Sequence, residues 1–269
     1  MLVKGGRPLQ GYSVGIMKFQ GKRYPLPPGD VANPASYPFP VLVREIPHVR
    51  TNPSPPLTRA DGSYTKIVED CIDAARQLEM DGVHSLAMCC GFFLLVQPVI
   101  AAAVRIPVLT SPLIMLPVIH RMLPPEAHVV VVTASKKFLT ADYFAAVGAD
   151  IDDRIVDAGL DDAPAFNSIC MGGTAITLET DHLRDEVVAA VAKARAENPM
   201  AEAVLLECTS LPPFAAELQV VPGSRCSTSW PASSGCIGRL FRSATRAIFE
   251  RPGAVSGKCV ISNSNGANR

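Results

Sequence analysis

The chain has 269 residues, of which 48% are hydrophobic and 19% are charged, a composition typical of a globular protein with a large core rather than a disordered chain. Its 25 basic and 25 acidic side chains balance, so nucleic acid and anionic membrane surfaces are not expected as partners. No apolar export segment follows Lys4 and Arg7, so the expected location is the cytoplasm, where the eight cysteines stay reduced.

The first part of the chain alternates strands with helices. Residues 12–19 predict a first strand, and the Pro- and Gly-rich stretch 21–40 predicts a long irregular loop. Apolar residues recur at helical spacing over 65–80 and predict a helix there. Residues 83–88 then predict a buried strand that ends at a pair of cysteines.

The run from Ser85 to Val104 contains no charged residue and is long enough to cross a membrane. Gly91 and several prolines divide this run and its continuation into short pieces. A strand, a buried helix and a second strand fit it better, because parallel sheets covered on both faces use strands that are apolar throughout. A membrane span is therefore not expected.

The second part of the chain repeats the alternation. In order, a strand, a helix, a short strand, a longer helix and a buried strand are predicted over 128–133, 136–147, 154–157, 183–197 and 203–207. Gly148 is expected to end the first of these helices, and Asp181 is expected to cap the second. The last strand ends at Cys208.

Alternating strands and helices predict an α/β fold with mostly parallel sheets. In each half an amphipathic helix leads to a buried strand that ends at a cysteine, which indicates a weak internal repeat. We therefore expect two similar doubly wound, flavodoxin-like lobes with an active-site cleft between them, where the carboxyl ends of the strands meet. The first lobe is assigned to residues 1–114, completed by part of 216–269, and the second to 115–215.

Two cysteines stand out because each follows a buried strand and precedes small or hydroxyl residues. Cys90 is followed by Gly91, and Cys208 by Thr209. Backbone N–H groups at such a junction lower the pKa of a thiol and bind carboxylates. Taken singly, each could equally be an inert buried cysteine. Cys71 lies on the inner face of a helix and is expected to be a core residue.

Other chemistry for the cysteines is less favoured. No CxxC pair or His and Cys cluster has the spacing of zinc ligands, so a metal is not expected. His84 and His120 are the nearest partners for a Cys-His pair, but a lone His in an apolar segment is more often structural. Cys170 lies in a loop-like stretch and is assigned no role.

Three motifs, GDVANPASYPFPV, CCGFFLL and LLECTSLPPFA, resemble the aspartate/glutamate/hydantoin racemase superfamily. More narrowly, the chain resembles a branch with Cys-Gly-Phe where amino-acid racemases have Cys-Asn-Thr. The resemblance runs from about Tyr12 to Ala216. It implies a mechanism without a cofactor, in which one cysteine thiolate removes a proton from carbon and the other thiol returns one on the opposite face. Cys90 and Cys208 match the two positions, and Cys90 is preferred to Cys89 because it directly precedes the glycine.

The resemblance also implies how a substrate would be held. Its carboxylate would meet backbone N–H groups and polar side chains after the strands, and the candidates are Asn33, Gly91, Thr133, Ser135 and Thr209. Lys18, near the end of the first strand, would bind a second carboxylate or simply be exposed. Replacement of Asn-Thr by Gly-Phe removes polar contacts to a substrate. The identity of the substrate is therefore less well defined by the motifs than the fold is.

The expected function is therefore a racemase or epimerase of a small aspartate- or glutamate-like carboxylate. A maleate-type cis-trans isomerase or a decarboxylase using one cysteine is an alternative within the superfamily. A non-catalytic protein that binds small molecules on the same scaffold is a third, because a fold does not determine a function. The sequence leaves the oligomeric state open, with a homodimer as one possibility.

The pattern changes after Ala216. From Val220 to Arg269, seven basic residues stand against a single acidic residue, Glu250, and no buried strand is evident. Two interpretations are open, a frame-shifted or otherwise foreign C-terminus and a divergent basic tail.

Overall fold

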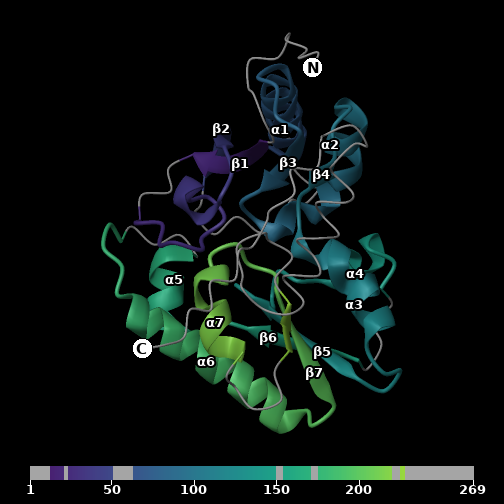
Figure 1. Cartoon of the computed structure of the whole chain (residues 1–269), viewed down its shortest axis with the longest axis vertical. Helices are drawn as coiled ribbons and strands as arrows, with labels where there is room; N and C mark the ends of the chain where they lie inside the picture. Colours follow the sequence, from purple (N-terminus) through teal and green to yellow (C-terminus); the bar gives the residue numbers. More distant parts are fainter. Residues whose placement is uncertain are drawn as a thin grey trace, which may run out of the picture.

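The computed structural model describes residues 13–20, 24–50, 63–149, 154–170, 175–219 and 225–227. They form two α/β lobes, each built on its own four-stranded sheet, and the first lobe lies above the second in Figure 1. Both sheets are parallel throughout. The predicted α/β class with two parallel-sheet lobes is confirmed, whereas the cleft between them stays a prediction.

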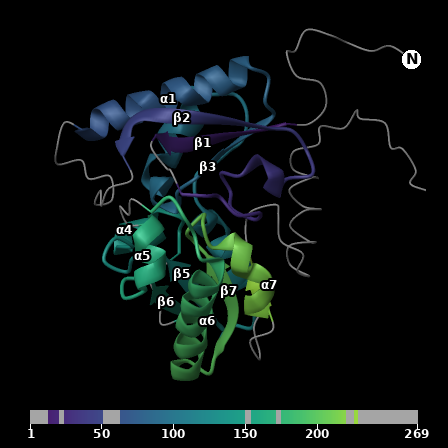
Figure 2. The same cartoon turned by 90° about the vertical axis from the view of Figure 1, so that its left-hand side faces the viewer.

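The first sheet has the strand order β2-β1-β3-β4. Its strands are β1 Val14–Gln20, β2 Val41–Arg50, β3 Ser85–Met88 and β4 Val108–Leu109. The helices of this lobe are α1 Ser63–Met80 and α2 Gln97–Ala103, with 3-10 turns η1 Pro34–Ser36, η2 Gly91–Val96 and η3 Pro112–Met115. Helix α1 lies along one face of this sheet (Figure 2).

The second sheet has the corresponding order β6-β5-β7-β8. Its strands are β5 His128–Thr133, β6 Ile155–Gly159, β7 Ala201–Leu206 and β8 Arg225–Ser227. Its helices are α3 Leu116–Met122, α4 Ala141–Ala146, α5 Pro164–Cys170, α6 Thr180–Glu197 and α7 Ala215–Gln219, with the 3-10 turn η4 Pro212–Phe214. The shared strand order is the structural form of the internal repeat.

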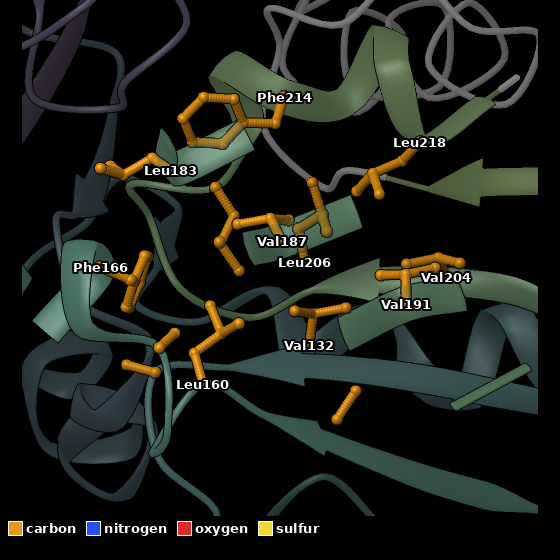
Figure 3. Close-up of a cluster of buried hydrophobic side chains, with 14 of the residues drawn as sticks. Val132, Leu160, Phe166, Leu183, Val187, Val191, Val204, Leu206, Phe214 and Leu218 are labelled. Carbon is orange, nitrogen blue, oxygen red and sulfur yellow. The ribbon is translucent and has the colours of Figure 1, made fainter. Parts of the chain in front are cut away.

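Strand β5 is apolar at nearly every position because both of its faces are covered. Val130 and Val132 face a cluster completed by α5, α6 and α7, part of which Figure 3 shows. Val129 and Val131 face a second cluster, completed by α3 and α4. Successive side chains of a strand point to opposite faces, so an uninterrupted run of valines suits a strand that is buried twice.

Strand β2 was not expected from the sequence. It pairs only with β1 among the described strands and so forms an edge of the first sheet. Arg44 and Glu45 are two of its residues, and Pro47 follows them. Charged residues and proline are tolerated at a sheet edge, where one side of the backbone has no partner. They also interrupt the apolar pattern from which a strand is predicted.

Two helix boundaries also differ from expectation. The predicted helix 136–147 is shortened to α4, because the backbone N–H of Lys136 and the hydroxyl of Ser135 bind the Asp161 carboxylate and hold this segment as a turn. Gly148 does end α4, with a φ of +66°. The prediction that Asp181 caps the longer helix is wrong, since it lies in the first turn of α6 and pairs with Arg184 at 2.8 Å.

The part of the chain from residue 215 onward contributes α7 and β8, and β8 extends the second sheet beside β7. Completion of the first lobe by this part stays a prediction, as do the lobe boundaries, and residues 228–269 lie outside the described residues. Within the described ranges, no helix combines the length and the hydropathy that are needed to cross a membrane.

Candidate active site

The carboxyl ends of β3 and β7 adjoin one another. The Thr209 hydroxyl, just past β7, donates a hydrogen bond of 2.7 Å to the carbonyl oxygen of Cys89, just past β3. A loop of the first lobe closes over the same place, because the Val31 N–H donates to the Thr209 carbonyl at 3.3 Å and the Tyr24 and Ser210 hydroxyls lie 2.8 Å apart. We call this region the strand-end junction.

Both predicted catalytic cysteines lie at the strand-end junction. Cys90 is half-buried and immediately precedes η2, and Cys208 is half-buried and follows Glu207. Cys89 differs, because it is 1% exposed and packs in the core of the first lobe. Exposure therefore favours Cys90 as the first thiol, and the catalytic roles of Cys90 and Cys208 stay predictions.

Cys170 joins this group although the sequence assigned it no role. It ends α5, and its side chain shares a hydrogen bond with the thiol of Cys208. That hydrogen bond, followed by burial and the nearby carboxyl of Glu207, holds the pKa of Cys208 well above its ordinary range, against the opposing effect of the Ser210 N–H. Cys208 is therefore a neutral thiol in this arrangement. Because α5 was not recognised and the two cysteines lie far apart in the sequence, no local pattern indicated the pair.

Replacing Cys170 by alanine should lower the pKa of Cys208, because the hydrogen bond is the largest cause of the raised value. Each unit by which the pKa of Cys208 falls should increase its alkylation rate near neutral pH by about tenfold. The rate is measured with iodoacetamide and peptide mass spectrometry, with Cys71→Ala as the matched control. An unchanged rate in Cys170→Ala would contradict the contact.

Glu207 is a second residue that sequence analysis did not select. Its side chain is 1% exposed, and its Oε2 accepts a hydrogen bond of 3.0 Å from the Thr133 hydroxyl. Burial, opposed by the Thr133 hydrogen bond and reinforced by Asp157, raises the pKa of Glu207 to about 7. Its one sequence signal is a carboxylate at the end of an otherwise apolar strand, directly before Cys208.

The predicted substrate-binding residues divide into two groups. The structure brings Gly91, Thr133 and Thr209 together at the strand-end junction, where both hydroxyls already donate to protein oxygens. Ser135 donates instead to Asp161 at 2.5 Å, and Asn33 holds its own loop by bonding the Ala35 N–H and the Leu26 carbonyl. Their role as substrate ligands stays a prediction.

Aromatic side chains surround Phe92, and the candidate carboxylate-binding residue Lys18 forms an ion pair. The Phe92 ring contacts the rings of Tyr143 and Phe138 edge-on, at centroid distances of 5.7 and 6.3 Å. The Tyr143 hydroxyl donates to the Phe92 carbonyl at 3.2 Å, and burial raises its pKa. Lys18 pairs with Glu45 at 3.2 Å, in the first sheet.

Comparison with known proteins identifies curated relatives among lyases. No protein-family profile matches the chain. A dimethylsulfoniopropionate lyase of Durusdinium sp. clade D is 26% identical over 216 residues, which cover 78% of this chain and 69% of that protein. Dimethylsulfoniopropionate lyase 6 of Emiliania huxleyi is 29% identical over 234 residues, covering 82% of this chain and 59% of its own length. The chain thus spans about three fifths to two thirds of these relatives.

Solved structures share the fold. Allantoin racemase from Klebsiella pneumoniae superimposes with a TM-score of 0.55 at 11% identity, over 94% of this chain and 97% of its own. Unliganded arylmalonate decarboxylase superimposes with a TM-score of 0.50 at 14% identity, over 91% and 95% of the two chains. The chain has the fold of the racemase and decarboxylase superfamily that its motifs resemble.

Proposed function

We propose that this chain is a cofactor-independent enzyme that removes a proton next to a carboxylate, and that it is a lyase breaking a carbon–sulfur bond in a small sulfonium carboxylate such as dimethylsulfoniopropionate. The observation that carries the proposal is the adjoining placement of Cys90 and Cys208 at the ends of β3 and β7. The names of the curated relatives support cleavage of a carbon–sulfur bond rather than the racemisation expected from the motifs.

In the proposed reaction the Cys90 thiolate takes the proton from the carbon beside the substrate carboxylate. The electron pair left on that carbon forms a carbon–carbon double bond, while the bond between the neighbouring carbon and sulfur breaks. The sulfonium leaves as a neutral sulfide with the electrons of that bond. From dimethylsulfoniopropionate the products are dimethyl sulfide, acrylate and the proton on Cys90, so the step needs no oxidant or reductant.

Cys208 has a different part in the proposal. Because its pKa is held above the ordinary range, Cys208 remains a thiol, and in the proposal its single S–H exchanges its partner Cys170 for the substrate carboxylate. Negative charge spreads onto the substrate carboxylate as the proton leaves, and a donor placed there stabilises the transition state. One ionised and one neutral cysteine therefore suffice, without a second base.

The surroundings of Cys90 suit a substrate with a cationic end. Phe92 follows it where the resembling racemases carry a polar residue, and an aromatic ring attracts a sulfonium as it attracts other cations. The buried carboxyl of Glu207 adds negative potential at the same junction.

A racemase or epimerase is the second candidate, favoured by the presence of two thiols rather than one. The cysteines follow corresponding strands of two similar lobes, an arrangement suited to reaching opposite faces of one carbon. In that reaction Cys208 would deliver a proton instead of a hydrogen bond.

The two functions separate in a single set of incubations in deuterated buffer. With dimethylsulfoniopropionate, the lyase releases dimethyl sulfide, measured in the headspace by gas chromatography, and acrylate, measured by NMR. With aspartate, glutamate or a hydantoin, a racemase incorporates deuterium and abolishes the circular dichroism of the substrate. Deuterium exchange into an amino acid without release of sulfide would replace the lyase by the racemase, and the absence of both reactions would overturn the thiol chemistry.

A further inference from the structure

We propose that Glu207 is a positioning residue that acts on Cys90 through Gly91, and this inference rests on the thiol chemistry proposed above. The backbone N–H of Glu207 donates to the Val132 carbonyl at 2.9 Å, which ties the residue to β5. Its side chain then reaches across the strand-end junction to Gly91, the first residue of η2. A residue of the second lobe thus contacts the backbone that carries the first thiol.

Contact between Glu207 and Gly91 leaves no room for a side chain at position 91. A Cβ atom built on Gly91 would lie 1.9 Å from Oε1 of Glu207 and 2.7 Å from its backbone carbonyl oxygen. Such distances are far below van der Waals contact, so every residue larger than glycine would displace the carboxyl. The Glu207 carboxyl therefore occupies the space beside Cys90 that a side chain at position 91 would otherwise fill.

Only one oxygen of this carboxyl is anchored. Oε2 accepts from the Thr133 hydroxyl, whereas Oε1 is buried with no hydrogen-bond partner among the described residues. A buried acceptor without a partner destabilises the folded chain, and an apolar side chain would avoid that cost. A purely structural role therefore gives no reason for a carboxyl here, while a role in the charge of the junction does.

Among the described residues, the titratable groups that face Glu207 are acidic or neutral. Asp157 faces Glu207 from β6, and Tyr143 faces it from α4. Cys208 follows Glu207 in the chain, and Cys90 precedes Gly91, the residue that the Glu207 carboxyl contacts. With its pKa raised to about 7, Glu207 changes charge near neutral pH. When it is ionised it opposes a second negative charge on Cys90, and when it is protonated it does not. Glu207 thus couples the position and the ionisation of the thiol.

The test measures the alkylation rate of Cys90 in the full chain from about pH 5 to about pH 9, by mass spectrometry with fragment ions that separate Cys90 from Cys89. In Glu207→Gln the midpoint should fall by about one pH unit, because the opposing charge is gone. The matched control is Glu202→Gln, the same change on β7 at a half-buried position, and its midpoint should equal that of the unaltered chain. Equal midpoints in Glu207→Gln and the unaltered chain would overturn the proposal.

A steric test keeps the proposal open to refutation if Glu207→Gln does not fold. Gly91→Ala should lower Tm, and adding Glu207→Ala should recover part of the loss, the remainder being due to the backbone carbonyl of Glu207. Additive losses in the double variant would show that the carboxyl does not fill this space and would overturn the inference. Alkylation and Tm need no substrate, so a shifted midpoint in a chain that releases no sulfide would refute the proposed lyase and leave the contact standing.

Discussion

Replacing Cys90 by alanine is expected to reduce kcat/KM for release of dimethyl sulfide by roughly 10²–10⁴-fold, the usual contribution of a positioned proton-transfer group. Replacing Cys208 by alanine is expected to reduce it by roughly 10²–10³-fold, the usual contribution of a hydrogen-bond donor to developing charge. Cys90→Ala removes the base, and Cys208→Ala removes the donor that faces the developing charge. Both half-buried thiols lie on adjoining segments, so each loss acts on the same substrate. Initial rates are measured by gas chromatography of the headspace.

Two controls make that result specific. Cys89→Ala should remain active, because Cys89 is 1% exposed and contributes to the junction only through its backbone carbonyl. Cys71→Ala should also remain active, since Cys71 is fully buried in α1 and burial raises its pKa to about 12. Cys90→Ala with undiminished activity would refute the assignment of the base, and loss in Cys89→Ala alone would transfer that role to Cys89.

Glu207→Gln is expected to raise the free energy of unfolding at pH 8 by about 3 kcal/mol and to change it little at pH 4. The pKa of Glu207 is raised in the folded chain from the ordinary 4.5 to about 7, chiefly by burial. The unfolded chain therefore ionises this group more readily, which favours unfolding above pH 4.5. In the unaltered chain, the stability that neutral Glu207 allows is fully present below pH 4.5 and is lost as the pH rises through about 7. Glutamine does not titrate, so the variant keeps this stability at pH 8.

Urea unfolding followed by circular dichroism at the two pH values measures the difference. Asp157, whose pKa burial raises to about 6, titrates in both chains, so most of its contribution cancels in the comparison. Glu202→Gln should show no such pH-dependent gain, because Glu202 is half-buried on β7 whereas Glu207 is fully buried. An equal gain at both pH values would show that removal of charge is not the cause.

A Glu207→Gln variant that is more stable at pH 8 and altered in the ionisation of Cys90 would connect the two effects. The same ionised carboxyl would then both destabilise the folded chain and oppose ionisation of Cys90.

The amino-acid sequence by itself determined the fold class and selected two candidate catalytic cysteines. Strand β5 is the clearest case, because its valines face a core on both sides and the residues 128–133 were predicted as they are observed. Cys90 and Cys208 were proposed because each lies just past a buried strand, and the ends of parallel strands are where such folds place their sites. The preference for Cys90 over Cys89 came from the resemblance of the Cys-Gly-Phe motif. These features depend on residues that are neighbours in the chain.

Only the tertiary structure decided which groups accompany those cysteines. Cys170, at the end of α5, shares a hydrogen bond with the Cys208 thiol. Glu207 of the second lobe fills the space at Gly91 of the first. Edge strand β2 was missed for a related reason, since its polar residues suit a position that only the sheet order defines. Periodicity records whether a residue is buried. It does not record which distant residue lies against it, and that packing sets the charge and pKa of the site.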